Sequence, residues 1–226
     1  LLFAKTLSRK RSEFKATLFS EKSLKQHRDL QIYTLLGHKI WLELESDREV
    51  IDYNELPKLI QFSFAERVLT HQFRFAVRKA NGVVQVIDIN SESHDAVEPQ
   101  ASASVVEIQD KSAAIQRWCA NQGIEYRLVS PDTFAGQEIR LSNLRAMLKF
   151  IESAHEARDV ACEERVNVIV ASLAPIPIRH IIQQLDDCDE TIVVAQLARG
   201  IFSGCFEAPI DRRRFDGALV INLAKS

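Results

Sequence analysis

The segment Thr70–Asn90, "THQFRFAVRKANGVVQVIDIN", constrains the fold more than any other stretch of the chain. Residues 73–77 alternate between apolar and polar side chains, as in a strand with one buried face. The Asn81-Gly82 pair predicts a two-residue turn, because both residue types tolerate the positive φ that such turns require. Val83–Ile89 is β-branched and mostly apolar, as expected of a central strand. The segment therefore predicts a β-hairpin in the middle of a sheet.

Helical and extended patterns on both sides of this hairpin predict a mixed α/β domain. Leu30–Glu45 carries apolar residues at helical spacing, and so does the segment 101–123, which Gly123 can terminate. Glu55–Phe64 and Ile124–Ser130 are predicted strands. The order of helix, strands, helix and strand indicates a mixed sheet flanked by helices.

The part of the chain after Pro131 has a different character. Helices are predicted over Leu141–Asp159, Ile178–Leu185 and Thr191–Gly204. Two short extended segments follow, "CFEAP" and "GALVINL", and the basic sequence "IDRRRFDG" separates them. Helices followed by a two-stranded wing are typical of a winged helix-turn-helix. We therefore expect two domains, an α/β domain over residues 1–139 and a mostly α winged-helix domain over residues 140–226.

The distribution of charge says more than the formal net charge of −2. Residues 1–28 hold eight basic and two acidic residues, which predicts either an arm that contacts phosphates or a solvated tail. A second basic group lies in the predicted wing and on the helix before it. The candidate DNA-binding residues are therefore Arg9, Lys10, Arg11, Arg199, Arg212, Arg213 and Arg214.

The third C-terminal helix is poorly suited to reading bases. Its segment "TIVVAQLARGIF" offers only Thr191, Gln196 and Arg199 as polar side chains, so sequence-specific reading of a major groove is not expected. Winged helices also serve as protein docking modules, and that alternative stays open.

The cysteines and the hydropathy pattern indicate the compartment. The four cysteines form no C-x-x-C pair and have no histidine at zinc-ligand spacing, so neither a zinc site nor a disulfide framework is predicted. No apolar run approaches the ~20 residues that cross a bilayer. We expect a cytoplasmic protein with no membrane partner.

Four segments resemble, in order, the TnsA family, the restriction-endonuclease-like subunits of heteromeric DNA transposases. They are Leu42–Ile60, the hairpin, Ile115–Phe134 and Ile139–Leu148. The resemblance implies a restriction-endonuclease-like fold for the first domain and a winged helix for the second. It also implies a role in cutting the 5′ ends of a transposon, with DNA, a DDE transposase and an AAA+ ATPase as partners.

The residues needed for cutting are missing from this sequence. Phosphodiester hydrolysis requires Mg²⁺ held between carboxylates, with a lysine nearby. The resemblance places Gly37 at the family's helical Glu, Gln72 at its Asp, and Asp88 and Asn90 at its Glu-x-Lys. One carboxylate among neutral groups does not suit Mg²⁺. We expect an inactive nuclease site without a cofactor, in which Asp88 is the one candidate metal ligand and either caps its strand or pairs with Lys79 or Arg78.

Three functions remain as hypotheses. The first is an accessory transposition subunit that binds transposon-end DNA, the transposase or the ATPase without cutting. The second is an active Mg²⁺-dependent endonuclease that uses displaced acids, Glu43, Glu45 and Asp47, with His71 as a base. The third is a winged-helix DNA-binding regulator unrelated to transposition.

Overall fold

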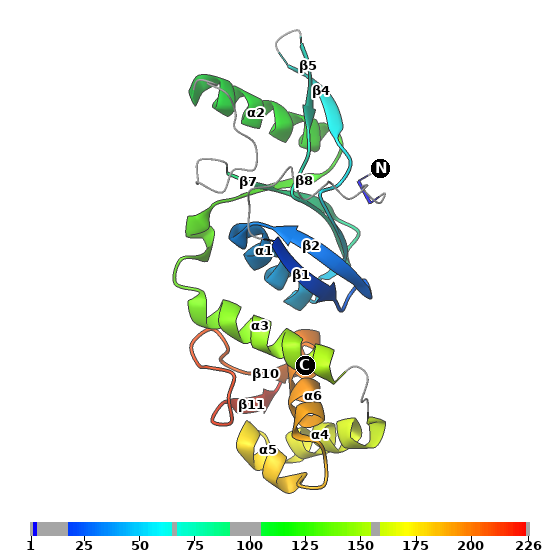
Figure 1. Cartoon of the computed structure of the whole chain (residues 1–226), viewed down its shortest axis with the longest axis vertical. Helices are drawn as coiled ribbons and strands as arrows, with labels where there is room; N and C mark the ends of the chain where they lie inside the picture. Colours follow the sequence, from blue (N-terminus) through cyan, green and yellow to red (C-terminus); the bar gives the residue numbers. More distant parts are fainter. Residues whose placement is uncertain (1, 4–17, 65–66, 91–104, 155–158, 225–226) are drawn as a thin grey trace. The chain divides into compact units, whose positions relative to one another are not determined.

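The computed structural model describes residues 2–3, 18–64, 67–90, 105–154 and 159–224 (Figure 1). It divides into two compact units. The first comprises residues 1–45 and 49–133, and the second comprises residues 46–48 and 134–226. The change of unit at Thr133–Phe134 lies a few residues before the predicted boundary at 139.

The first unit opens with a hairpin followed by a helix. Strands β1 (Leu18–Ser23) and β2 (Arg28–Tyr33) pair antiparallel, and α1 (Leu35–Ser46) follows at once. The predicted helix over Leu30–Glu45 is therefore wrong in its first turn, because residues 30–33 belong to β2. Thr34 separates the two elements with a φ of 80°, and its Oγ1 accepts a hydrogen bond from the N–H of Gly37 at 3.0 Å. This bond caps the start of α1.

The central sheet has the strand order β3-β6-β7-β8. Its strands are β3 (Val50–Glu55), β6 (Phe75–Lys79), β7 (Val84–Ile89) and β8 (Glu125–Val129). The predicted hairpin is confirmed for β6 and β7, which pair antiparallel around Asn81-Gly82, with Gly82 at a φ of 84°. Helix α2 (Val105–Asn121) connects β7 to β8, which runs parallel to β7.

The hairpin predicted over Thr70–Asn90 begins later than expected, because a separate hairpin contains its first residues. Strands β4 (Ile60–Phe64) and β5 (Arg67–His71) pair with each other, so residues 70 and 71 belong to β5. The predicted strand over Glu55–Phe64 is interrupted, because Leu56 has a φ of 48° and Pro57 follows it. Apolar side chains from β4, β6, β7 and α2 then form one core, which includes Leu2.

The second unit is mostly helical. Its helices are α3 (Glu138–Ser153), α4 (Val160–Leu173), α5 (Ile178–Gln184) and α6 (Glu190–Ser203), and the 3-10 helix η2 (Pro131–Phe134) precedes them. The strands β9 (Ile176–Pro177), β10 (Phe206–Glu207) and β11 (Val220–Leu223) form an antiparallel sheet in the order β10-β11-β9. From α4 onward the order is helix, strand, helix, helix, strand, strand.

The helix boundaries follow local capping. The predicted helix over Leu141–Asp159 is too long, because α3 ends at Ser153 and Asp159 instead caps α4, accepting from the N–H of Cys162 at 3.1 Å. Asp189 caps α6 in the same way through Thr191, at 2.7 Å, and Gly204 ends that helix in the left-handed region.

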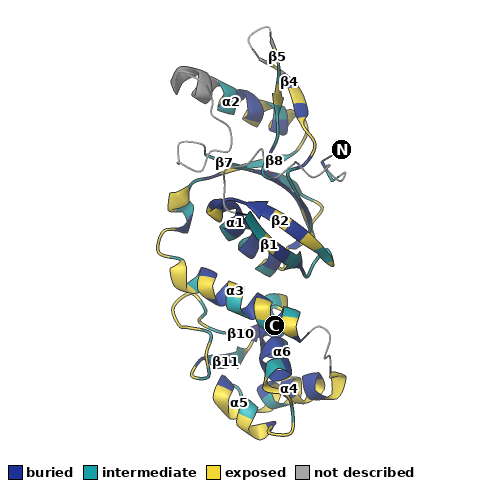
Figure 2. Ribbon diagram, viewed as in Figure 1, coloured by how far each residue is buried: buried dark blue, intermediate teal, exposed yellow. Residues whose placement is uncertain are grey.

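Helix α6 forms the centre of the second unit. Half of its residues are buried (Figure 2), namely Ile192, Val193, Val194, Ala195, Leu197, Ala198 and Gly200. Helices α3, α4 and α5 and strand β10 all contact it. The chain is thus a mixed α/β protein with N-terminal strands, a mixed sheet and a mostly helical C-terminal part. Among the described residues, no helix is both long enough and apolar enough to cross a membrane.

Candidate functional site

A hydrogen-bonded pair, His71 and Asp88, lies at the ends of two strands of the first unit. His71 is the last residue of β5, and Asp88 is the next-to-last residue of β7. Nε2 of His71 lies 2.7 Å from Oδ2 of Asp88, and the two side chains are only 15% and 17% exposed. The other carboxylate oxygen, Oδ1, accepts a hydrogen bond from the N–H of Ile89 at 3.0 Å. Asp88 therefore has partners on both of its oxygens.

The surroundings of this pair are apolar and aromatic. The ring of His71 stands edge-on to the ring of Phe73, with 4.9 Å between the centroids, and the ring of Tyr126 lies 6.4 Å from that of Phe73. Burial, together with the negative charge of Asp88, raises the pKa of the Cys119 thiol to about 11. The same two causes raise the pKa of Tyr126 above its ordinary value. Both the Cys119 thiol and the Tyr126 hydroxyl therefore hold their protons more tightly than they would in water.

The expected pairing of Asp88 with Lys79 or Arg78 is wrong. Lys79 Nζ lies 3.0 Å from Oε2 of Glu125, and the guanidinium of Arg78 lies 4.4 Å from the ring centroid of Phe3. Sequence reasoning missed the bond to His71 because it depends on the separate hairpin of β4 and β5. The only signal in the sequence was that His71 directly precedes Gln72, the residue that the resemblance places at the family's Asp.

The other positions carried over from the resemblance have structural contacts. Gln72 donates from Nε2 to the carbonyls of Leu56, at 3.2 Å, and Pro57, at 2.9 Å. The N–H of Asn90 donates to the carbonyl of Val129 at 2.9 Å, which extends the β7–β8 pairing. A Cβ atom at Gly37 would lie 3.2 Å from Oγ1 of Thr34, so this position is closely packed. In the described ranges, no three His, Cys, Asp or Glu side chains gather as a metal site would require.

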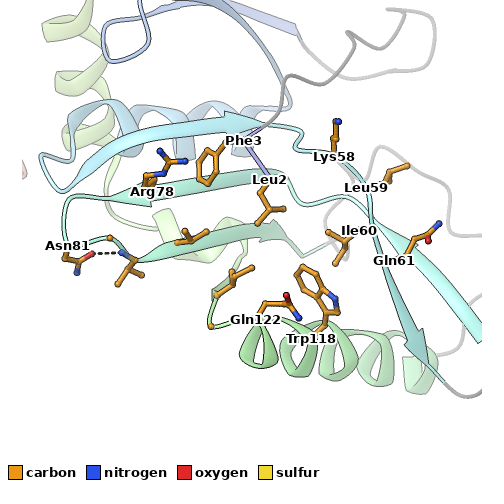
Figure 3. A pocket seen from close by; sticks show the side chains of 15 residues that line it. Leu2, Phe3, Lys58, Leu59, Ile60, Gln61, Arg78, Asn81, Trp118 and Gln122 are labelled. Carbon is orange, nitrogen blue, oxygen red and sulfur yellow. Dashed lines mark hydrogen bonds between the residues drawn. The ribbon is translucent and has the colours of Figure 1, made fainter.

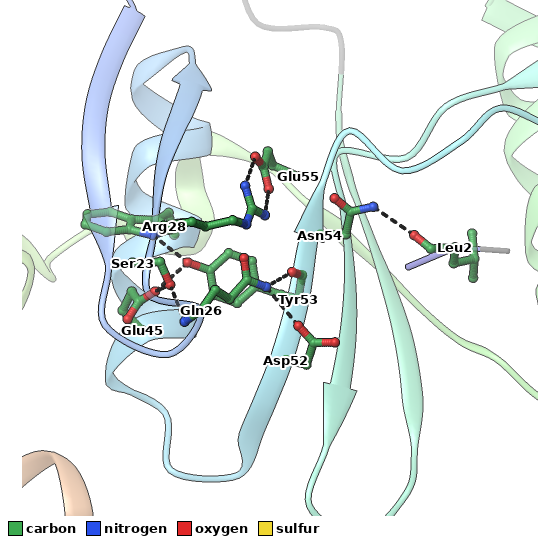
Figure 4. Close-up of polar contacts among 10 residues, drawn as sticks. Leu2, Ser23, Gln26, Arg28, Glu45, Asp52, Tyr53, Asn54 and Glu55 are labelled. Atoms are coloured by element: carbon green, nitrogen blue, oxygen red, sulfur yellow. Dashed lines mark hydrogen bonds and ion pairs between the residues drawn. The ribbon is translucent and has the colours of Figure 1, made fainter. Parts of the chain in front are cut away.

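Of the displaced acids, Glu45 and Glu43 hold other parts of the first unit together, and Figure 4 shows the contacts of Glu45. Asp47 is exposed and belongs to the second unit. Glu45 is 3% exposed, and its carboxylate accepts from Oγ of Ser23 at 2.5 Å, from the N–H of Leu24 at 3.2 Å and from the hydroxyl of Tyr53. Glu43 accepts from Nη2 of Arg127 at 3.1 Å. Glu45 thereby anchors the β1–β2 turn to α1 and β3.

A groove of the first unit is lined mainly by apolar residues (Figure 3). It has a volume of about 960 Å³ and lies between β4, the β6–β7 turn and the end of α2. Leu2 and Phe3 lie in it, and the carbonyl of Leu2 accepts from Nδ2 of Asn54 at 3.0 Å. Among its lining residues only Lys58 and Arg78 are charged, so the groove offers no acid–base pair.

In the second unit, the candidate polar residues of α6 contact α4. Nη1 of Arg199 lies 2.6 Å from Oε1 of Glu163, which is buried. Gln196 donates from Nε2 to Oδ1 of Asn167 at 3.0 Å. In a recognition helix these side chains would point toward the bases of DNA, whereas here they are bonded to α4.

The three arginines of the predicted wing lie in the loop 208–219, between β10 and β11, and all three are exposed. Asn143 of α3 holds the backbone of this loop through three hydrogen bonds. Sequence reasoning missed Asn143, whose only signal is a polar residue on the apolar face of a predicted helix. Arg9, Lys10 and Arg11 lie outside the described residues.

Comparison of the chain with protein-family models and with curated proteins gave no match. The resemblance to the TnsA family therefore stays a hypothesis based on the sequence segments and their order.

Proposed function

We propose that this chain is a TnsA-like DNA transposition protein whose nuclease site is inactive. It acts as an accessory subunit that binds transposon-end DNA, or links a DDE transposase to its AAA+ ATPase, or does both. Activity as a Mg²⁺-dependent endonuclease, or as a regulator unrelated to transposition, is the alternative.

The topology of the first unit supports this proposal. A helix precedes a mixed sheet, an antiparallel hairpin forms its centre, and a crossover helix leads to a parallel edge strand. This arrangement is compatible with a restriction-endonuclease-like core, in which the end of the hairpin's second strand carries catalytic residues. Here Asp88 lies at that end.

The topology of the second unit also supports it. The order helix, strand, helix, helix, strand, strand, with β11 between β9 and β10, is compatible with a winged helix. The loop between the last two strands then corresponds to the wing. Fold alone does not identify a partner, so the transposition role depends on the resemblance.

The observation that carries the inactive site is the hydrogen bond between His71 and Asp88. A carboxylate that held Mg²⁺ would direct its oxygens at the ion, together with further hard oxygen ligands. Oδ2 of Asp88 instead lies 2.7 Å from the imidazole, and the amide of Gln72 is bound to two backbone carbonyls. Asp88 thus joins β7 to β5, and Gln72 holds the link between β3 and β4.

A nicking assay tests the inactive site. The purified full chain is incubated with supercoiled plasmid and Mg²⁺ or Mn²⁺, and we expect no conversion to the open circle. The variants Asp88→Ala and Glu43→Gln are purified in the same way. Equal nicking by the wild type and both variants would reveal a contaminating nuclease. Metal-dependent nicking by the wild type that Asp88→Ala abolishes would establish the endonuclease alternative instead.

Association with partners tests the transposition role. We expect the chain to co-purify with a DDE transposase and an AAA+ ATPase encoded beside its gene, when the three are expressed together. If no such genes lie beside it, or if the purified proteins do not associate, the transposition role is wrong and the regulator alternative gains support.

A further inference from the structure

The loop 208–219 presents three consecutive arginines without acidic partners. Arg212, Arg213 and Arg214 are all exposed, and no acidic side chain in the described part of the chain pairs with them. The acidic residues of the same loop have other contacts. Asp211 lies 3.3 Å from Nε of Arg140, and Asp216 accepts from the N–H of Ala218 at 2.9 Å. The guanidinium groups are therefore available to an external anion.

The backbone of this loop is fixed from one side by Asn143. The side chain of Asn143 donates from Nδ2 to the carbonyls of Ile210 and Arg213, at 2.7 Å each, and its Oδ1 accepts from the N–H of Phe215 at 2.8 Å. Asn143 is only 4% exposed. One buried amide thus holds the backbone on both sides of the arginine run, and it uses both of its polar groups to do so.

The other end of the loop is fixed by α5. The N–H groups of Ile178 and Arg179 donate to the carbonyls of Leu219, at 3.0 Å, and Gly217, at 2.9 Å. The loop therefore has its conformation before any ligand binds, and binding does not have to order the backbone. Arginine suits such a site because its planar guanidinium donates two hydrogen bonds to one phosphate.

Helix α6, by contrast, is not accessible to a DNA groove. Helix α3 packs along it, half of its residues are buried, and Arg199 and Gln196 contact α4. Reading bases through α6 would require α3 to leave its position. Contacts through the loop alone would be made to phosphates, which carry no sequence information.

We propose that the loop 208–219 is a phosphate-binding surface for duplex DNA, that Asn143 is its positioning residue, and that it binds without reading sequence. The choice of DNA as the polyanion rests on the proposed function, whereas the surface itself rests on the contacts above.

Fluorescence anisotropy with two unrelated duplexes of equal length, across a salt series, tests the surface. We expect the full chain to bind both duplexes with affinities within about threefold of each other. Replacing the three arginines together, Arg212→Gln, Arg213→Gln and Arg214→Gln, should weaken binding more than tenfold at low salt. Because each phosphate contact adds about 0.9 to the salt slope, that slope should fall by roughly 2 to 3.

The matched control removes three exposed cations elsewhere, through Lys58→Gln, Arg117→Gln and Arg145→Gln. Arg145 is two residues from Asn143 on α3 and so lies on a different face of that helix. The control changes the net charge equally and should leave the salt slope within about 1 of the wild type. If the control lost as much affinity as the loop variant, binding would follow net charge and the proposed surface would be wrong.

Asn143→Ala tests the positioning role, because it keeps every arginine. We expect it to weaken DNA binding about three- to tenfold and to speed trypsin cleavage after residues 212–214, while duplex DNA protects these bonds in the wild type. Unchanged affinity and cleavage in a folded variant would remove Asn143 from the proposal. If Asn143→Ala does not fold, the test is whether duplex DNA protects the wild-type loop from trypsin. Absence of this protection would refute the proposed phosphate-binding surface.

The outcomes separate this inference from the proposed function. A chain that associates with the transposase and the ATPase but binds no duplex would refute the loop surface and leave the transposition role intact. Loop-dependent DNA binding by a chain that does not associate with those partners would support the loop surface and refute the transposition role. Loss of partner association, rather than of DNA binding, in the arginine variant would identify the loop as a protein docking surface and overturn the inference.

Discussion

Nε2 of His71 lies 2.7 Å from Oδ2 of Asp88, which ties the last residue of β5 to the end of β7. Among the described strands, β4 and β5 pair only with each other, so this bond is one of the contacts that fix their hairpin to the central sheet. Phe62 and Ile60 of β4 contribute to the shared core and form the apolar part of the same attachment.

The bond between His71 and Asp88 should be measurable as a coupling free energy. In a double-mutant cycle with His71→Gln and Asp88→Asn, we expect the free energies of unfolding to be coupled by about 0.5 to 1.5 kcal/mol. Urea denaturation at pH 7 provides the measurement. The exposed pair of Lys79 and Glu125 serves as the control cycle, with an expected coupling below about 0.5 kcal/mol. Additive effects at His71 and Asp88 would show that the bond contributes nothing.

The buried carboxylate of Glu45 should contribute strongly to stability. Glu45→Ala leaves the hydroxyls of Ser23 and Tyr53 and the N–H of Leu24 without their acceptor. We expect a loss of about 2 to 3 kcal/mol in the free energy of unfolding, because unsatisfied buried donors are costly. Glu45→Gln keeps one acceptor oxygen and should lose less. Equal losses in the two variants, measured by urea denaturation, would contradict this interpretation.

Alkaline pH should destabilise the protein through Tyr53. Burial, with the charge of Glu45 adding to it, raises the pKa of Tyr53 well above its ordinary value. The unfolded chain releases this proton near pH 10, whereas the folded chain retains it. The stabilising contribution is therefore complete below about pH 10 and declines as pH rises further, by about 1.4 kcal/mol per pH unit.

Tyr53→Phe should reduce this alkaline decline. The variant should be less stable than the wild type at pH 7, because it loses the hydrogen bonds to Glu45 and from Trp41. Its urea midpoint should fall less steeply between pH 10 and 11. Parallel curves for the two proteins over that range would show that Tyr53 does not titrate as described.

Gly200 should not accept a side chain. A Cβ atom at this position of α6 would overlap the ring of Phe206 on β10. We expect Gly200→Ala to destabilise the second unit by about 2 to 3 kcal/mol despite the higher helix propensity of alanine. Gly217→Ala, where the new atom would lie 3.4 Å from Cβ of Arg179, should change the stability by less than about 0.5 kcal/mol. Similar thermal midpoints for both variants would contradict the close packing.

The cysteines should differ in their reaction with iodoacetamide at pH 8. Cys119 and Cys162 are buried, and burial is the main cause that raises their pKa values to about 11 and about 12. Cys205 is exposed. Since the thiolate is the reactive form, we expect Cys205 to be alkylated first and the two buried cysteines only after unfolding in urea. Mass spectrometry of tryptic peptides measures the order, and early labelling of Cys119 would contradict it.

Much of the local structure could be predicted from the sequence. The β6–β7 hairpin, the extent of α5 and α6, and the strand β8 all follow from turn residues, periodicity and capping. These signals lie within a few residues of the element that they specify. The candidate positions Gly37, Gln72, Asp88 and Asn90 could also be named from the sequence, but their contacts could not.

The tertiary structure alone decided the remaining features. It divided the predicted helix Leu30–Glu45, because residues 30–33 pair with β1 and this pairing overrides their helical spacing. It joined His71 to Asp88 and Asn143 to the loop of Arg213, across 17 and 70 residues of sequence. Such contacts form only when distant segments fold against each other, whereas the periodicity of a single segment reports just which of its faces is buried.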